Sequence, residues 1–293
     1  MDTMKFGIAF ANIGPNIEPE RACELARSAE SAGFESIWTA DHIVVTAGYQ
    51  STYPYDRSGR LPSGEDAPFP ESLIWLAYVA RATSTIRLAT GILILPERNP
   101  VVLAKELATL DYLSSGRVTL GVGIGWLREE FEAIGVPYRG RGERLEESVG
   151  AMRALWSQEC ATFEGMTVRF KDVYLRPQPR AGTIPIHIGG HTEIAADRAG
   201  RIGDGYFPFG VDRGRLPGLL GTMRVAAQEA GRDPSSIEVT VSSFVTADAA
   251  AAVADVAELI ELGATRVVIP AALFPGDIAD SLAHYGDHVI NRL

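Results

Sequence analysis

The residues of this sequence best suited to chemistry follow short apolar runs. Asp41 and His42 are adjacent, directly after the run 36–39, and they combine a carboxylate with an imidazole. Such a pair can hydrogen-bond a heterocyclic ligand and transfer a proton near neutral pH. Asp and His are also common in turns, so the alternative is that Asp41 only caps a turn. We take both residues as candidate catalytic groups.

A second candidate is a glycine inside an apolar run. Thr90, Gly91 and Ile92 lie in the middle of the run 86–95. A glycine there weakens a strand unless the backbone bulges or approaches a ligand closely. The alternative is that Gly91 makes room for a bulky neighbour in the core. From the residues alone, the ligand-contacting bulge and core packing are equally good interpretations.

A third candidate is the segment GVGIGW, residues 121–126, where glycines alternate. Gly123, Ile124 and Gly125 would offer a backbone face without side chains, against which a flat ring system can lie. The segment does not fit GxGxxG, and the chain contains no GxxxxGK[ST]. It therefore indicates neither a Rossmann nor a P-loop nucleotide site.

A fourth candidate is the segment HIGGHT, residues 187–192. Gly189 and Gly190 end an apolar run just before a helical pattern, so their amides would meet the positive end of a helix dipole and suit a phosphate. The alternative is an ordinary helix start capped by Thr192. His187 and His191 straddle the junction and cannot share a helical face. Because no HExxH motif occurs either, we expect no metal site.

These segments belong to a repeat of apolar run, amphipathic segment and glycine. Parallel strands joined by crossover helices produce this repeat, and eight units can be counted. The predicted strands are 6–11, 36–39, 86–95, 118–122, 184–188, 203–207, 237–242 and 266–269. Eight such units in 293 residues predict an α/β fold, a (β/α)8 TIM barrel with its active site where the strands end. A doubly wound open sheet is the alternative.

Two segments fall outside the repeat. Residues 46–70 are rich in Pro, Gly, Tyr and Ser, which predicts one long loop of the kind that often carries function. Residues 161–179 alternate in polarity as a small hairpin does. No linker or change of composition divides the chain. We therefore expect a single domain, 1–293, with insertions at the C-terminal mouth of the barrel.

Composition excludes several classes of function. A net charge of −10 and a pI near 5.1 argue against a nucleic-acid binder or a protein held on anionic lipid, because both need a basic surface. Eighteen consecutive apolar residues do not occur, so no membrane-spanning helix is predicted. No leader peptide is recognised, and Cys23 and Cys160 lack CxxC spacing. We expect a cytoplasmic protein with neither a disulfide framework nor a zinc site.

Four segments together resemble the luciferase-like monooxygenase family, and within it the coenzyme F420-dependent oxidoreductases. They are SAESAGFESIWTADHIV, STIRLATGILILPERNP, LATLDYLSSGRVTLGVGIGW and IPIHIGGHTEIAADRAGRIGDGYF, in the family's order and spacing. The likeness runs from about Lys5 to Phe207. It implies a (β/α)8 barrel with the cofactor at the C-terminal ends of the strands, and a homodimer.

The resemblance also implies roles for individual residues. Asp41 would contact the edge of the deazaflavin ring, and His42 would lie near the reacting face as a proton donor or acceptor. The bond between Gly91 and Ile92 would be a non-proline cis peptide in a bulge behind the ring. Gly189 and Gly190 would bind the phosphate, and residues 123–125 would lie beside the ring.

One residue departs from the family pattern. Trp126 stands where the family's sugar-phosphate dehydrogenases carry a glutamate, which argues against a sugar-phosphate substrate. Together with Tyr53, Tyr55 and Phe69 of the long loop, Trp126 indicates an apolar or aromatic substrate pocket, with packing of the loop as the alternative. We therefore expect Trp126 and Tyr53 to bind substrate.

The leading hypothesis is an F420-dependent oxidoreductase that passes a hydride between C5 of the deazaflavin and a small organic substrate. The first alternative is an FMN-dependent two-component monooxygenase on the same barrel, supplied with reduced flavin by a partner reductase. The second is a non-catalytic F420 carrier or sensor. A phosphate-handling isomerase or aldolase is disfavoured, because no lysine lies at the candidate strand ends.

Overall fold

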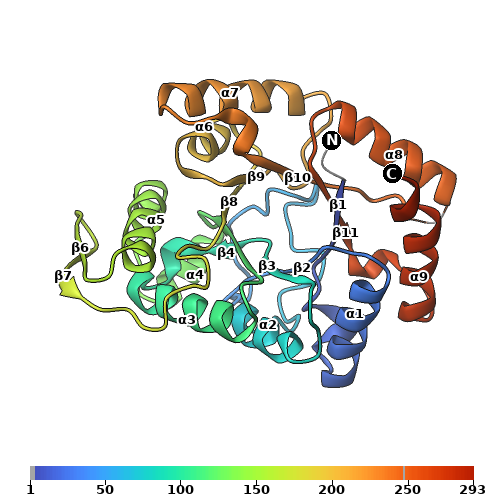
Figure 1. Cartoon of the computed structure of the whole chain (residues 1–293), viewed down its shortest axis with the longest axis horizontal. Coiled ribbons are helices and arrows are strands. Elements are labelled where there is room, and N and C mark those ends of the chain that lie inside the picture. The colour runs from blue at the N-terminus through green and yellow to red at the C-terminus, as the bar shows by residue number, and fades with distance from the viewer. Residues whose placement is uncertain (1–3, 247) are drawn as a thin grey trace.

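The computed structural model describes residues 4–246 and 248–293, and its centre is a closed barrel of parallel strands (Figure 1). Around the barrel the hydrogen-bonded order is β3, β2, β1, β11, β10, β9, β8 and β5, and β5 pairs again with β3. The (β/α)8 barrel is confirmed, and the open doubly wound sheet is wrong. The expected single domain also included residues 1–3 and 247, which lie outside the described residues.

Each barrel strand is short. They are β1 (Lys5–Ala9), β2 (Ser36–Thr39), β3 (Arg87–Thr90), β4 (Leu93–Ile94), β5 (Val118–Gly123), β8 (Ile186–Gly189), β9 (Gly205–Phe207), β10 (Glu238–Ser242) and β11 (Arg266–Pro270). Both β3 and β4 pair with β5, so they share one position in the barrel. The predicted continuous strand 86–95 is therefore wrong: it is two strands separated at Gly91 and Ile92.

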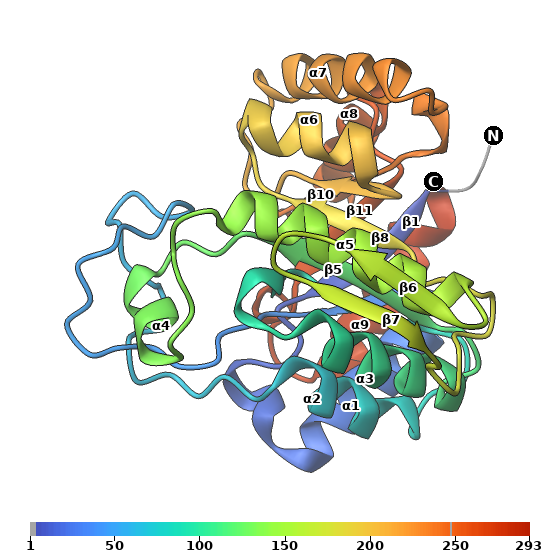
Figure 2. The same ribbon diagram turned by 90° about the vertical axis from the view of Figure 1, so that its left-hand side faces the viewer.

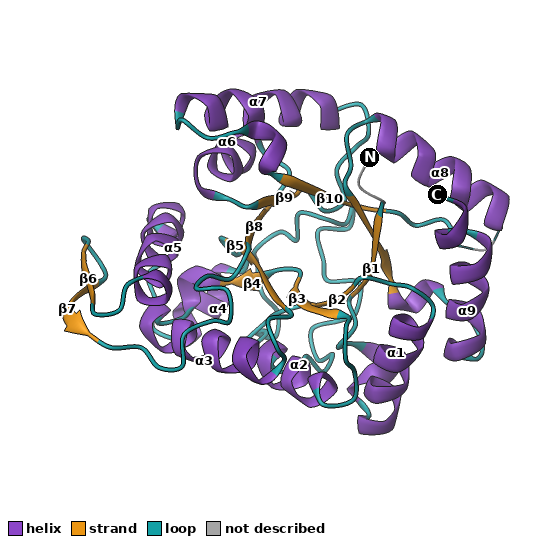
Figure 3. Cartoon of the chain, in the orientation of Figure 1, coloured by secondary structure: helices purple, strands orange, loops and turns teal. Residues whose placement is uncertain are grey.

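The helices form an outer ring around the strands (Figure 3). They are α1 (Pro19–Ser31), α2 (Ser72–Ala80), α3 (Pro100–Leu113), α4 (Arg128–Ala133), α5 (Arg141–Ser157), α6 (Glu193–Ile202), α7 (Leu216–Glu229), α8 (Ala249–Glu261) and α9 (Ile278–His288). Local chemistry sets their starts: Asn99 accepts hydrogen bonds from the amides of Val101 and Val102 at the start of α3. No helix in the two described ranges is long and apolar enough to cross a membrane.

The insertions lie at different places on the barrel. The long loop after β2 and the short helix α4 project together from one end of the barrel (Figure 2). This is the end where the strands finish, as predicted. The hairpin is formed by β6 (Ala161–Glu164) and β7 (Arg169–Val173), which pair antiparallel. It stands outside the barrel beside α5, away from the mouth that the loop and α4 help to enclose.

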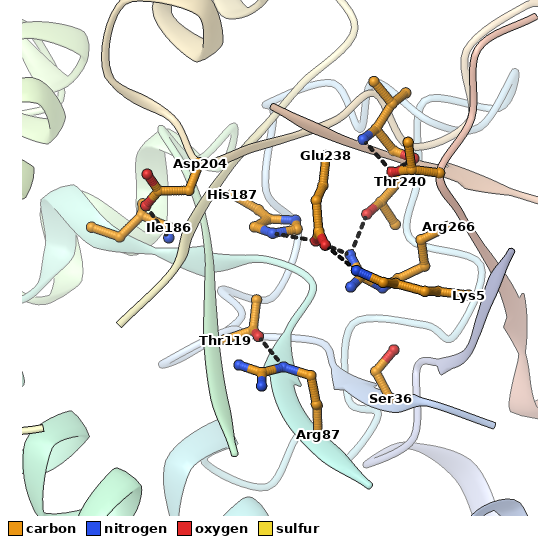
Figure 4. Close-up of polar contacts among 12 residues, drawn as sticks. Lys5, Ser36, Arg87, Thr119, Ile186, His187, Asp204, Glu238, Thr240 and Arg266 are labelled. Carbon is orange, nitrogen blue, oxygen red and sulfur yellow. Dashed lines mark hydrogen bonds and ion pairs between the residues drawn. The ribbon is translucent and has the colours of Figure 1, made fainter. Parts of the chain in front are cut away.

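A network of charged side chains, with Arg266 and His187 buried, lies at the opposite end of the barrel, where the strands begin (Figure 4). Arg266 on β11 bonds Glu238 on β10 at 2.8 Å, and Lys5 and His187 reach the same carboxylate. Burial alone would raise the pKa of Glu238, but these partners hold it well below its usual range. His187 is therefore a structural residue. Above this network, Trp38, Phe207 and Val268 fill the barrel with side chains.

Candidate active site

A cavity of about 1210 Å³ opens at the C-terminal end of the barrel. Eleven of the twelve predicted site residues line it: Asp41, His42, Tyr53, Gly91, Ile92, Gly123, Ile124, Gly125, Trp126, Gly189 and Gly190. Thr90 does not, because its hydroxyl points back into the sheet and donates to the Gly121 carbonyl at 2.7 Å. The four candidate segments are thus brought together around one space.

The bulge in the third strand position shapes the floor of the cavity. The peptide bond between Gly91 and Ile92 is cis, as the family resemblance implied. Trp38 and Phe207 pack closely behind Gly91: a Cβ added there would lie 3.1 Å from each ring. Gly91 therefore lies in a bulge and also makes room for bulky neighbours, whereas its contact with a ligand stays a prediction.

The alternating glycines of β5 have a different role from the one predicted. A Cβ on Gly121 would lie 2.0 Å from the Thr90 carbonyl oxygen, and one on Gly123 would lie 2.5 Å from Ile92 Cδ1. Gly189, on the next strand, would meet the same Ile92 side chain at 2.7 Å. These glycines accommodate the bulge, because their bare faces are covered by Ile92 and the Thr90 backbone. The surface that a ring would rest on is therefore partly the Ile92 side chain.

Both carboxylate oxygens of Asp41 accept hydrogen bonds from the protein. One carboxylate oxygen accepts the amide of Ile94 at 2.9 Å, and the other accepts Arg98 at 2.7 Å and the hydroxyl of Ser72 at 3.3 Å. The side chain is only 1% exposed. Its carboxylate therefore fixes β4 and the end of the bulge, and the contact of Asp41 with the edge of a ring stays a prediction.

His42 is held on the wall of the cavity by a residue that the sequence did not single out. Its Nδ1 lies 2.7 Å from Oε2 of Glu130, on α4. Oε1 of the same carboxylate accepts the amides of Ile43 and Val44, at 2.6 and 3.2 Å. The Glu130 side chain is fully buried. In the sequence, Glu130 is one of several charged residues in a short segment, residues 128–132. Nothing in that segment indicates that Glu130 contacts His42.

The neighbouring Glu129 holds the long loop at the mouth. Its carboxylate accepts the amides of Gln50 and Ser51 and the hydroxyl of Ser51, the first at 2.7 Å. Although desolvation acts in the opposite sense, these hydrogen bonds lower the pKa of Glu129 to about 2. Two successive residues of α4 therefore hold one loop segment at both ends: Glu130 contacts His42, and Glu129 binds Ser51.

A second buried carboxyl lies nearby. Glu97 follows β4, is 7% exposed, and neither of its carboxyl oxygens has a hydrogen-bond partner among the described residues. Burial, and then the negative charges of Glu130 and Asp41, raise the pKa of Glu97 to about 9. A pKa in this range would keep Glu97 protonated at pH 7. In contrast to Glu97, Glu130 has hydrogen-bond partners for both of its carboxyl oxygens.

Of the two glycines predicted to bind a phosphate, Gly190 has its amide hydrogen-bonded within the protein. The Gly190 amide is not available, because it donates to the Phe207 carbonyl at 3.2 Å and so extends the pairing of β8 with β9. The next amides, at residues 191–194, start α6 and have no acceptor within the described residues. Arg141 and Arg198 also line the cavity, but Arg198 is ion-paired with Glu146 at 2.9 Å. The start of α6 and Arg141 can together hold an anion.

Aromatic side chains cover the rest of the cavity. Trp126 packs edge-to-face on Tyr53 and on His42, with ring centres 5.2 and 5.8 Å apart. Tyr55 packs in the same way on Phe209, at 5.7 Å. Burial raises the pKa of the Tyr53 hydroxyl above its usual range. The part of the chain that the structure describes contains no group of three or more His, Cys, Asp or Glu able to hold a metal.

The family is settled by comparison with known proteins. The family model described as luciferase-like monooxygenase matches residues 4–287. The chain therefore belongs to the luciferase-like monooxygenase family. An uncharacterized protein of Mycobacterium tuberculosis (strain ATCC 25618 / H37Rv) is 33% identical over 293 residues, which cover 99% of both chains.

Two relatives named for their activities depend on different cofactors. An F420-dependent glucose-6-phosphate dehydrogenase of Kineococcus radiotolerans is 33% identical over 78% of this chain and 65% of its own length. An FMNH2-dependent dimethylsulfone monooxygenase of Pseudomonas fluorescens is 34% identical over 76% of this chain and 56% of its own length. The fold is also that of the coenzyme F420-dependent tetrahydromethanopterin reductase from Methanopyrus kandleri, with a TM-score of 0.79, 20% identity and 99% of each chain covered.

Proposed function

We propose that this protein is an F420-dependent oxidoreductase that transfers a hydride between the deazaflavin and a small organic substrate. The observation that carries the proposal is a single cavity with an apolar floor at Ile92, a proton-transferring group at His42 and an anion site at the start of α6. The floor and the anion site suit a tricyclic ring with an anionic tail. The proton-transferring group suits a hydride transfer that is accompanied by a proton.

The residues present fit such a cofactor. Ile92 would support the ring, the amides at residues 191–194 would hold the phosphate, and Arg141 would lie beside the tail. The F420 tail carries carboxylates beyond its phosphate, and this chain, with a net charge of −10, nevertheless has Arg128 and Arg141 along the cavity, besides Arg198, which is paired with Glu146. This charge distribution favours F420 over FMN, whose tail ends at the phosphate.

The chemistry divides between cofactor and protein. When bound, the deazaflavin supplies a two-electron hydride donor or acceptor. The protein orients the substrate against Trp126 and Tyr53, and His42 gives or takes the accompanying proton. The aromatic wall excludes water and favours an apolar or aromatic substrate.

Cofactor titration tests the proposal. The purified protein is titrated with F420 and with FMN, each oxidised and reduced, and binding is followed by fluorescence. We expect micromolar or tighter binding of F420 and weaker binding of FMN. Submicromolar FMN binding with negligible F420 binding would overturn the proposal and favour an FMN-dependent monooxygenase with a partner reductase. The similarity to the Pseudomonas fluorescens monooxygenase keeps that alternative in the test.

We also propose that the protein acts as a homodimer. Large apolar side chains are exposed on the outer faces of α2 and α3, which are neighbours in the ring: Ile74, Tyr78, Val102 and Leu113. A second copy packed on this face would bury them. Light scattering coupled to gel filtration should give twice the mass of one chain, and a single-chain mass at micromolar concentration would contradict this.

A further inference from the structure

The contact between His42 and Glu130 bears on which nitrogen of the imidazole ring carries the proton. Oε1 of Glu130 receives two backbone amides, which can only donate, so this oxygen is an acceptor. Oε2 lies 2.7 Å from His42 Nδ1. A carboxylate with both oxygens accepting requires a proton on Nδ1. The other ring nitrogen, Nε2, then carries a lone pair.

The surroundings of the ring leave Nε2 accessible from the cavity. His42 lines the cavity, and Phe69 and Trp126 pack edge-to-face against it, with ring centres 5.3 and 5.8 Å away. Within residues 4–246 and 248–293 no group hydrogen-bonds Nε2, and this atom is not among the buried polar atoms that lack a partner. Glu130 therefore lies behind the ring, and the cavity lies in front of it.

We propose that Glu130 is a positioning residue that holds His42 in the Nδ1–H tautomer, so that Nε2 faces the substrate as a base. The consequence for catalysis rests on the proposed function, whereas the tautomer itself does not. Glu130 would also balance the positive charge that His42 acquires when it takes a proton.

This arrangement suits a substrate with a hydroxyl on the reacting carbon. When bound, the cofactor would accept the hydride that leaves the carbon as its C–H bond breaks. The O–H bond breaks and its proton goes to Nε2, while the carbon and oxygen form a carbonyl. In the reverse direction Nε2–H returns the proton to the oxygen. The substrate class is therefore an alcohol and carbonyl pair, and the aromatic wall favours one with apolar substituents.

Replacing Glu130 by glutamine gives a sharp test. In Glu130→Gln only the amide oxygen can accept from Ile43 and Val44, so the amide nitrogen must face Nδ1 and donate to it. The proton of neutral His42 then moves to Nε2. The matched control is Glu132→Gln, an exposed residue on the same helix. The variant reverses the tautomer with almost no change in side-chain shape.

The tautomer is read by NMR without any cofactor. Long-range ¹H–¹⁵N correlations of ¹⁵N-histidine-labelled protein resolve the five histidines, and His42→Gln identifies the signal of His42. Above the pH at which that signal titrates, we expect Nδ1–H in the wild type and in Glu132→Gln, and Nε2–H in Glu130→Gln. An Nε2–H tautomer in the wild type, or no change in Glu130→Gln, would overturn the inference.

Kinetics then test the catalytic consequence. With apolar secondary alcohols, Glu130→Gln should lower kcat about 100-fold with little change in KM, and Glu132→Gln should change neither. A wild-type kcat in a variant whose tautomer is reversed would overturn the role in catalysis. Failure to bind F420 would instead refute the proposed function and leave the tautomer result standing.

Discussion

Glu97 provides a quantitative test of the electrostatics around the cavity. Its carboxyl is buried without a hydrogen-bond partner among the described residues, and the pKa of Glu97 is raised from 4.5 to about 9. Between these two values the folded protein keeps a proton that the unfolded chain has released. The free energy of unfolding must therefore fall as the pH rises through this window, by up to about 1.4 kcal/mol per pH unit.

Glu97→Gln removes this titration and keeps the shape of the side chain. At pH 5.5, one pH unit above 4.5, the wild type should already have lost about 1.4 kcal/mol relative to its fully protonated form. The difference between the variant and the wild type at this pH is the reference. At pH 7.5 the variant should have gained about 2.7 kcal/mol relative to the wild type, two pH units at about 1.36 kcal/mol each. The relative gain should level off above pH 9, where Glu97 ionises in the folded protein as well.

Urea denaturation followed by circular dichroism at pH 5.5, 6.5 and 7.5 measures this difference. Glu132→Gln is the matched control, because it removes an exposed carboxyl from α4, and its curve should run parallel to the wild type. Parallel curves for the wild type and Glu97→Gln would refute the reasoning, since they would mean that Glu97 ionises similarly in both states.

Three further predictions concern the cavity itself. Gly123→Ala should destabilise the protein by about 1–3 kcal/mol in urea denaturation, because its Cβ would meet Ile92. Adding Ile92→Ala should recover part of this loss of stability. Purely additive effects of the two substitutions would contradict the contact. Asp41→Ala should cost about 3 kcal/mol in the same assay, since it leaves Arg98 buried with only Glu71, and an unchanged midpoint would be inconsistent with the ion pair. Trp126→Ala should raise KM for aromatic substrates at least tenfold while F420 binding, measured by fluorescence, stays within a factor of three; equal losses of both would place Trp126 in the cofactor site instead.

Local patterns of the sequence predict much of the architecture. The eightfold repeat predicts a barrel because each strand and helix buries one face at a fixed period. The position of the bulge is marked by Gly91, and the mouth by Asp41 and His42, because parallel strands all end on the same side. These features depend on residues close in the chain, so they can be recognised without the fold.

The partners of those residues were decided by the tertiary structure. His42 and Glu130 are 88 positions apart, and no local pattern in the sequence predicts that α4 folds over β2. The alternating glycines of β5 indicated an open surface, but the neighbouring strand brings Ile92 onto them. The sequence predicted that Asp41 binds a ligand, but it did not predict that Arg98 and the amide of Ile94 donate to its carboxylate. A sequence shows which groups are available, whereas hydrogen bonds and burial depend on distances that only packing between distant segments sets.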